Sequence, residues 1–153
     1  MTCCRGRPAG VGGVRVVTFE PAHLAGMDPP AFDAAQLQRF AAAYRAAGPA
    51  FSLLESGSAL GCGGLVIEGR EGRAWAFLSA RLRARPMLLH RTVSRALPAL
   101  AGHYDLESVS AEAHVDFTAA RSWLRRLGFH FETIVPRCGG TTENYARYRL
   151  WVH

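Results

Sequence analysis

Residues Ala120 to Glu132 read ARSWLRRLGFHFE, a short stretch in which the hydrophobic period changes abruptly. Trp123, Leu124 and Leu127 fall at spacings that place them on one stripe of a helix. Gly128 then stands where a helix usually stops, because glycine alone enters the left-handed conformation without steric cost. Beyond it aromatic and polar residues alternate, as in a half-buried strand. The segment therefore predicts a helix, a glycine turn and a strand in immediate succession.

The length and the N-terminus limit the class of protein. A chain of 153 residues is most simply one domain. We expect residues 1–13 to form a disordered tail and residues 14–153 to form that domain. No apolar stretch follows Arg5 and Arg7, so the tail does not have the pattern of a signal peptide. No apolar run approaches the roughly 20 residues that span a bilayer, so we expect no membrane association and a cytoplasmic protein.

The charge is carried in an unusual way. The chain has a formal net charge of +6, and all 18 of its basic side chains are arginine, with no lysine. The arginines are scattered, and the densest group is Arg81, Arg83 and Arg85. Positive charge permits attraction to nucleic acid or to an acidic ligand, but no nucleic-acid-binding motif accompanies it. A charged surface is therefore favoured over nucleic-acid binding.

The cysteines and histidines do not form a ligand set. Cys3 and Cys4 are adjacent in the tail, Cys62 lies in a strand-like run and Cys138 in a turn. No pair has CxxC spacing, and the histidines are dispersed. We predict neither a disulfide framework nor a metal site.

The order of the expected elements defines the fold class. The patterns predict six strands and a seventh after the last loop, at 14–20, 50–56, 59–68, 74–79, 106–115, 129–135 and 143–152. Helices are expected at 32–47, 86–100 and 117–127, with a short helix or turn after Pro21 and with Pro98 kinking or shortening the last turn of the second. An α/β (α+β) fold follows, with a mixed, mostly antiparallel sheet and helices on both faces. Residues Tyr145 to Val152 would suit an edge strand that pairs across a dimer, although the oligomeric state stays open.

This order, with AARSWLRRLGF near its end, resembles the GNAT superfamily of acyl-CoA-dependent N-acetyltransferases. The shared pattern is a strand, a short loop and a helix that ends in the junction Leu127-Gly128-Phe129. A phage- or prophage-encoded branch of that superfamily looks most similar to this chain, on the segments AWAFLSARLRARPMLLHRTVSRALPAL and VDFTAARSWLRRLGF. The resemblance implies that the junction is architectural, with Trp123 and Phe129 in the core.

The resemblance also implies acetyl-CoA as cosubstrate. In the superfamily the cofactor lies between the fourth and fifth strands, with its pyrophosphate on the N-terminus of the next helix. The corresponding positions here are Leu78, Ser79, Ala80, Arg81, Arg83, Arg85 and Met87. The family loop is rich in glycine, whereas this chain has RLRARPML, and Pro86 has no N–H to donate. Either the three arginines replace those donors with guanidinium groups, or they form a solvated basic loop.

The expected catalytic groups also depart from the family. Leu124 occupies the position of the tyrosine that protonates the leaving thiolate, and Phe117 replaces the asparagine that often opens the helix. Tyr145 or Tyr148 could substitute as the acid. Glu112, His114 and Asp116, on or just after one strand, are the candidate bases. Glu68 is a weaker candidate, and each carboxylate could instead be an ordinary strand-end charge.

Three hypotheses follow. The first is a GNAT-fold protein that binds acetyl-CoA and acetylates an amine of an unknown small-molecule or protein acceptor. The second is a non-catalytic phage or prophage GNAT-like protein, virion-associated through phage structural proteins or acting on the host. The third, a small nucleic-acid binder, rests on net charge alone. The acceptor pocket is expected from Pro21 to Tyr44 and from Arg137 to Asn144, which carry no interpretable motif.

Overall fold

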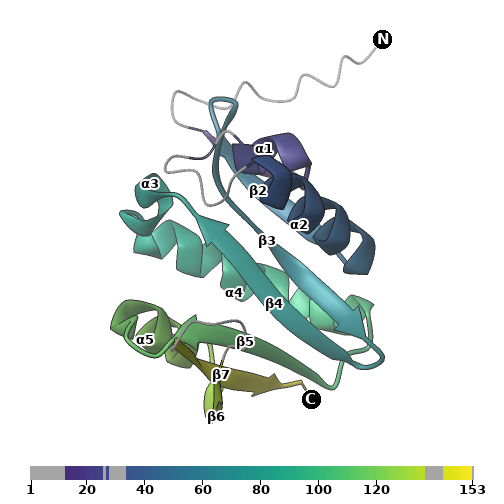
Figure 1. Cartoon of the computed structure of the whole chain (residues 1–153), viewed down its shortest axis with the longest axis vertical. Coiled ribbons are helices and arrows are strands. Elements are labelled where there is room, and N and C mark those ends of the chain that lie inside the picture. The colour runs from purple at the N-terminus through teal and green to yellow at the C-terminus, as the bar shows by residue number, and fades with distance from the viewer. Residues whose placement is uncertain (1–12, 26, 28–33, 137–142, 153) are drawn as a thin grey trace. The chain divides into compact units, whose positions relative to one another are not determined.

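The computed structural model describes residues 13–25, 27, 34–136 and 143–152 (Figure 1). Seven strands form one sheet in the order β1-β2-β3-β4-β5-β7-β6. Their bounds are β1 Val14–Thr18, β2 Ala50–Glu55, β3 Ser58–Glu68, β4 Glu71–Leu78, β5 Ser108–His114, β6 His130–Pro136 and β7 Asn144–Trp151. The helices are α1 Pro21–Ala25, α2 Ala34–Ala47, α3 Ala80–Arg83, α4 Pro86–His103 and α5 Thr118–Arg126.

The strand pairing confirms the predicted fold class. β1 pairs with β2, β2 with β3, β5 with β7 and β6 with β7, all antiparallel. The pair formed by β4 and β5 is parallel, with Glu71 opposite Ser108. The sheet is therefore mixed and mostly antiparallel, and helices accompany it, as the sequence patterns predicted.

The chain divides into two compact units. The first contains the described residues of Met1–Gly64 together with Ala76–Arg85, and the second contains Leu65–Trp75 together with the described residues of Pro86–His153. The expectation of one domain over residues 14–153 stays a prediction.

The first unit has apolar side chains buried between its helices and strands. Phe19, Leu24, Leu60 and Leu82 are at most 2% exposed, and α1 packs against α2. Ser52, Leu53 and Leu54 are all buried in β2, and the pairing of β2 with β3 shifts register between the two leucines. Successive side chains of a strand point to opposite faces, so consecutive buried residues mean that neither face of β2 is open to solvent at this point.

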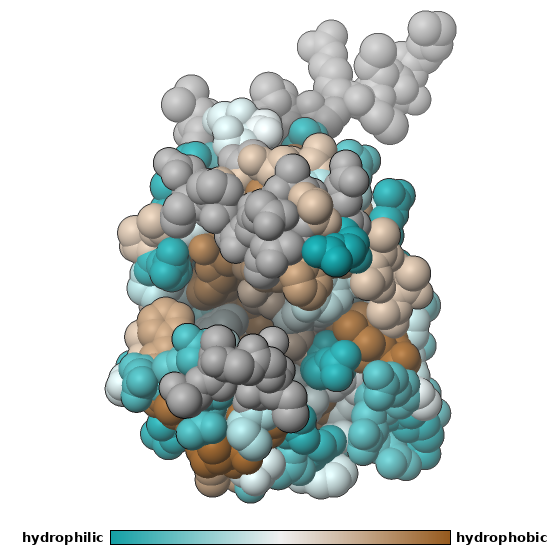
Figure 2. All heavy atoms as spheres, in the orientation of Figure 1, coloured by the Kyte–Doolittle hydropathy of each residue, from teal (hydrophilic) through white to brown (hydrophobic). Residues whose placement is uncertain are grey.

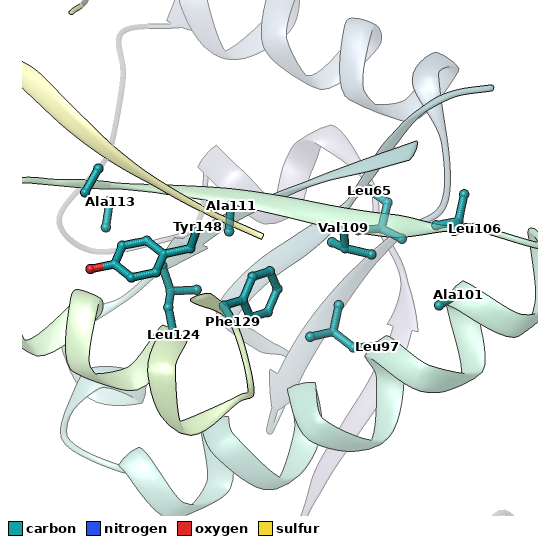
Figure 3. Close-up of a cluster of buried hydrophobic side chains, with 11 residues drawn as sticks. Leu65, Leu97, Ala101, Leu106, Val109, Ala111, Ala113, Leu124, Phe129 and Tyr148 are labelled. Atoms are coloured by element: carbon teal, nitrogen blue, oxygen red, sulfur yellow. The ribbon is translucent and has the colours of Figure 1, made fainter. Parts of the chain in front are cut away.

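The second unit has an apolar core on one face of β5 and β7 (Figure 3). Val109, Ala111 and Ala113 alternate along β5 and face this core, where Ala146 and Tyr148 of β7 join them. Helices α4 and α5 cover that face through Leu97, Ala101 and Leu124, and Phe129 fills the space beside them. The prediction that Phe129 belongs to the core is confirmed, since it is 2% exposed.

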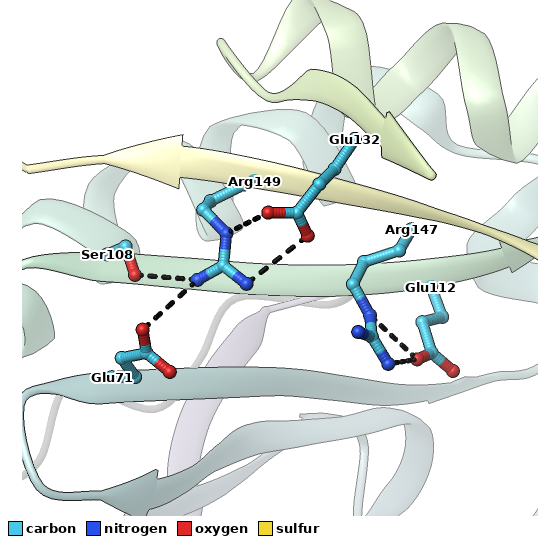
Figure 4. Close-up of polar contacts among 6 residues, drawn as sticks. All are labelled: Glu71, Ser108, Glu112, Glu132, Arg147 and Arg149. Carbon is cyan, nitrogen blue, oxygen red and sulfur yellow. Dashed lines mark hydrogen bonds and ion pairs between the residues drawn. The ribbon is translucent and has the colours of Figure 1, made fainter. Parts of the chain in front are cut away.

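The opposite face of the same strands carries charge (Figure 4). Arg149 of β7 lies between Glu132 of β6 and Glu71 of β4, with N–O distances of 2.7 Å and 3.6 Å. Arg149 also donates to the hydroxyl of Ser108 at 2.9 Å. These ion pairs cross from strand to strand, so they bind β4, β5, β6 and β7 laterally on the side away from the core.

Three local expectations need correction. The strand expected at the sheet edge, β7, lies between β5 and β6, because it pairs with both. Helix α4 continues to His103, so Pro98 does not shorten it. The segment after β4, expected to be a loop, forms the short helix α3.

Several predictions concern residues outside the described part of the chain. They are the disordered tail predicted over residues 1–13, of which residues 1–12 lie outside, a helix start near Phe32, and the positions of Cys3, Cys4 and Cys138. Most of Arg137 to Asn144 also lies outside it.

On the face shown in Figure 2, apolar and polar side chains are interspersed among the described residues. The large hydrophobic side chains that are exposed in the described part of the chain include Val16, Phe40, Met87, Tyr104, Phe117, Phe131, Ile134 and Trp151. None of the helices in the described ranges is long and apolar enough to cross a membrane.

Candidate functional site

The segment after β4 is a closed helical turn. Ser79 is 3% exposed, its backbone N–H donates to the carbonyl of Leu60 at 2.9 Å, and its Oγ accepts the N–H of Leu82 at 3.2 Å. It therefore caps α3 in the way that serine commonly caps a helix. Leu78 ends β4 and Ala80 begins α3, so the predicted cofactor residues surround this cap.

The backbone donors of this turn are already used. The N–H groups of Arg83, Ala84 and Arg85 donate to the carbonyls of Ser79, Ala80 and Leu82 at 2.9–3.1 Å. Together with the capped Leu82 N–H, four successive donors are satisfied within the turn. A backbone cradle for phosphate, which needs free N–H groups, is therefore not formed by these four residues.

A glycine on the neighbouring strand makes this compact turn sterically feasible. A Cβ at Gly61 of β3 would lie 2.6 Å from Cδ2 of Leu82 and 3.1 Å from the carbonyl oxygen of Phe77. Leu82 is 2% exposed, so α3 is seated on the strand through this contact. The glycine expected in the family's loop is absent here, and Gly61 has a different, structural function.

Two of the three predicted arginines are held by one carboxylate. Glu55, at the end of β2, receives Arg81 Nη2 on Oε1 at 2.8 Å and Arg85 Nη1 on Oε2 at 2.5 Å. The hydrogen bond from Arg85 holds the pKa of Glu55 below its ordinary value, and the charge of both arginines adds to this effect. Arg83 is exposed and makes no ion pair with the described residues. No local pattern indicates Glu55 as the partner of Arg81 and Arg85, because the pairing joins segments far apart in the chain.

The remaining cofactor position, Met87, belongs to the second unit. It is the second residue of α4 and is 73% exposed, after Pro86 at the first position. Proline suits that position because its missing N–H has no partner in the helix. Met87 therefore presents an apolar side chain at the start of a long helix.

The candidate bases lie on the charged side of β5. Glu112 and His114 are two residues apart, and their cross-strand partners on β7 are Arg147 and Tyr145. Arg147 donates twice to Glu112 Oε1, from Nε at 3.2 Å and from Nη2 at 2.9 Å (Figure 4). The structure thus gives Glu112 a guanidinium partner that sequence reasoning missed, because the register of β5 with β7 depends on tertiary pairing.

His114 and Asp116 are brought together at the end of β5. Nδ1 of His114 accepts the backbone N–H of Asp116 at 3.1 Å and lies 3.8 Å from Asp116 Oδ2. The ring also packs edge-on against Tyr145 at 5.5 Å between centroids. In the neutral ring this arrangement places the hydrogen on Nε2, so that His114 presents a donor there.

The two tyrosines considered as acids differ sharply. Tyr148 is completely buried, and its hydroxyl accepts Nε of Arg121 at 3.0 Å. Leu124, which stands where the family has its tyrosine, is 7% exposed in the same core (Figure 3). Tyr148 is therefore inaccessible to a reacting group, whereas Tyr145 is half-buried beside His114.

A buried polar cluster in the first unit was not foreseen. Ser52 Oγ lies 2.6 Å from His23 Nδ1 and 3.4 Å from Cys62 Sγ. Burial raises the pKa of the Cys62 thiol, and Ser52 is 1% exposed. A buried, protonated thiol is a poor nucleophile, so this cluster is structural.

The described residues include no group of three or more His, Cys, Asp or Glu side chains that could hold a metal ion. A pocket of about 290 Å³ in the first unit is lined by Thr18, Phe19, Arg45 and residues 48–51. It contains none of the predicted site residues.

Comparisons with known proteins identify the fold. No protein-family model matches the sequence, and no curated protein matches it. Ard1 from Thermoplasma volcanium is similar in structure, with a TM-score of 0.74 at 15% identity over 92% of this chain and 98% of that one. A GNAT-family acetyltransferase from Bacillus anthracis has a TM-score of 0.70 at 11% identity, over 90% and 94% of the two chains.

A third structure contains the cofactor. The putative acetyltransferase YncA from Salmonella typhimurium, solved with acetyl-CoA, has a TM-score of 0.66 at 14% identity, over 90% of this chain and 93% of that one. These similarities extend over nearly the whole of each chain. The chain therefore has the fold of the GNAT acetyltransferases.

Proposed function

We propose that this protein binds acetyl-CoA and transfers the acetyl group to an amine. The observation that carries the proposal is the likeness, over 90% of the chain, to an acetyltransferase structure that holds acetyl-CoA. When bound, acetyl-CoA would supply an activated thioester. The protein would have to hold it, exclude water, take up the protons that the acceptor nitrogen loses and return one proton to the leaving thiolate.

The chemistry of the side chains after β4 fits the cofactor's phosphates. Arg81, Arg83 and Arg85 offer guanidinium groups, which bind phosphate oxygens through paired, charge-assisted hydrogen bonds. They would take over the binding that the occupied N–H groups of the turn cannot provide. Leu78, Ser79 and Ala80 would contribute backbone and packing at the end of β4, and the exposed Met87 would supply an apolar contact.

In the second unit we propose that Glu112 removes the proton of the acceptor ammonium group. An ammonium acceptor must lose a proton before its nitrogen can attack a thioester. Both hydrogen bonds from Arg147 reach Oε1 of Glu112, so Oε2 is the oxygen that we propose accepts the proton. His114 would position the acceptor through Nε2, with Asp116 fixing its tautomer. Tyr145, beside His114, is our candidate to protonate the leaving thiolate.

Calorimetric titration with acetyl-CoA tests the binding. We expect saturable binding with a dissociation constant on the order of micromolar, as for about −8 kcal/mol. Replacing Arg83 by Gln should weaken it several-fold, whereas the exposed Arg73→Gln, on β4, serves as a charge-matched control. Absence of binding at millimolar acetyl-CoA would contradict the proposal.

A turnover assay with a panel of amines tests the proton acceptor. Glu112→Gln should lower kcat by about 10²-fold, the usual contribution of a general base, with binding of acetyl-CoA unchanged. Glu107→Gln removes a carboxylate just before β5 and should leave turnover unaltered. Full activity in the Glu112 variant would show that the assignment is wrong.

A second candidate is a GNAT-like protein without catalysis. It is supported by the buried Tyr148, by Leu124 in the core and by the occupied N–H groups of residues 82–85. A role in virion assembly or host interaction, and origin in a phage or prophage, belong to this candidate. Binding of acetyl-CoA without turnover of any amine would favour it.

A further inference from the structure

The carboxylate of Glu55 is held as an anionic ligand would be held. Each of its two oxygens receives a different arginine, Arg81 at 2.8 Å and Arg85 at 2.5 Å. The Glu55 side chain is 16% exposed, whereas the two arginine side chains are 59% and 42% exposed. The carboxylate is thus the partly enclosed member of the cluster, and the cations lie on its outer side.

Regular structure holds both sides of this cluster in place. Glu55 is the last residue of β2 and pairs with Ser58 across the turn into β3. Helix α3 is fixed to β3 by the bond from Ser79 N–H to the Leu60 carbonyl and by the seating of Leu82 on Gly61. The carboxylate and the two guanidinium groups therefore meet through elements of the same unit.

A phosphate group would compete for the same donors. Phosphate and carboxylate oxygens bind guanidinium N–H groups with closely similar geometry. With Glu55 in place, Oε1 occupies an N–H group of Arg81 and Oε2 occupies an N–H group of Arg85. Of these three arginines, Arg83 is the one that makes no ion pair with the described residues. A diphosphate approaching Arg81 and Arg85 would also meet the negative charge of Glu55 at close range.

We propose that Glu55 is an internal competitor for an anion-binding site formed by Arg81, Arg83 and Arg85, and that a diphosphate group must displace it to bind. This inference rests on the proposed function for its natural ligand, the diphosphate of acetyl-CoA. The same chemistry would accept free inorganic diphosphate. The protein then sets its affinity for the ligand by the strength of its own ion pairs, which makes Glu55 a determinant of affinity without direct contact to the ligand.

Calorimetry on the full chain tests the proposal with two probes, acetyl-CoA and inorganic pyrophosphate. Glu55→Gln removes the competing charge and keeps the shape of the side chain. We expect it to bind both probes roughly three- to tenfold more tightly, the range set by two partly exposed ion pairs. Glu20→Gln, an equal change of charge at an exposed residue of the same unit, should bind as the unaltered protein does.

A double-mutant cycle shows whether the gain in affinity on Glu55→Gln depends on Arg81 and Arg85. In an Arg81→Gln, Arg85→Gln background, Glu55→Gln should change the affinity for pyrophosphate by less than about twofold, because the competition has been removed. An equal gain in that background would assign the effect to general repulsion and overturn the proposal. Far-ultraviolet circular dichroism and the unfolding midpoint verify that each variant is folded.

The two probes separate failure of this inference from failure of the proposed function. If the unaltered protein binds acetyl-CoA and Glu55→Gln binds it equally or more weakly, Glu55 positions the arginines and the competitor proposal is wrong. If no variant binds acetyl-CoA at millimolar concentration, the proposed function fails, and the pyrophosphate titration still tests the role of Glu55. Tighter binding of pyrophosphate by Glu55→Gln than by the unaltered protein would support the competitor proposal, and equal or weaker binding would overturn it.

Discussion

At the scale of single residues, the junction at Gly128 shows what local sequence can specify. Its φ of +99° is open to glycine and strained for other residues, and α5 ends two residues earlier at Arg126. The prediction of a helix stop here is confirmed, because it depends only on neighbours along the chain. Glu55 shows the opposite case. Its partners follow 26 and 30 residues later, so no local pattern indicates them.

Gly128→Ala should destabilise the protein by about 1–2 kcal/mol, because a Cβ at this positive φ approaches the following carbonyl. The added Cβ would also lie 3.4 Å from Cδ1 of Leu150, which limits relaxation. Equilibrium unfolding in urea measures the change. Gly102→Ala is the matched control, since a Cβ at this exposed position in α4 meets nothing within 4 Å. It should stabilise by up to about 1 kcal/mol.

Ser52→Ala should destabilise the first unit by about 1 kcal/mol, the typical worth of a buried hydrogen bond. The change removes the hydroxyl that lies within bonding distance of His23 and Cys62. Urea unfolding gives the free energy, and Ser94→Ala, at an exposed serine of α4, is the comparison. Equal stability of the Ser52 variant and the unaltered protein would mean that the cluster contributes nothing.

At the scale of elements, hydrophobic period predicted the strands and main helices, while tertiary pairing decided their order in the sheet. The insertion of β7 between β5 and β6 follows from cross-strand partners such as Tyr148 with Ala111 and Phe131. Such pairings join positions far apart in sequence. For the same reason, the sequence pattern did not indicate Arg147 as the partner of Glu112. Helix α3 was missed because its four residues are too few to show a period.

Replacing Pro98 tests how far packing stabilises α4 where a backbone hydrogen bond is missing. The helix continues past it to His103, although proline has no N–H for the carbonyl of Ser94. Pro98→Ala should therefore stabilise the protein by roughly 1–3 kcal/mol, since it restores that donor at an exposed position.

The thermal midpoint and urea unfolding both report the effect of Pro98→Ala. Pro86→Ala is the control, because a proline at the first helical position costs no hydrogen bond, and it should change stability by less than about 0.5 kcal/mol. A Pro98 variant no more stable than the unaltered protein would show that the helix has adapted to the missing bond.

At the scale of the whole molecule, stability should depend on acidic pH through Glu55 and Glu132. Hydrogen bonds from Arg85 and Arg149, respectively, hold the pKa of each carboxyl below its ordinary value of 4.5. The unfolded chain therefore binds protons more readily than the folded one as the pH falls. This contribution is complete above the ordinary value and is lost as the pH falls through it to the lower folded values.

Urea unfolding at several pH values between 7 and 3 measures this dependence. The free energy of unfolding should decrease as the pH is lowered from 7 to 3. This decrease should be smaller in a Glu55→Gln, Glu132→Gln double variant. Glu20→Gln is expected to retain the full dependence of the unaltered protein. A double variant with an unaltered slope would place the acid sensitivity in other carboxylates.

The ion pairs across β4, β5, β6 and β7 have a consequence for chemical self-modification. Arg147 and Arg149 provide the cations there, and the whole chain has no lysine. A guanidinium group stays protonated at any physiological pH and has no free electron pair with which to attack a thioester. If the proposed acetyl donor binds, these cross-strand links are inert to it. Acetyl-lysine detected in an assay mixture would then mark an acceptor, since this chain has no lysine to label.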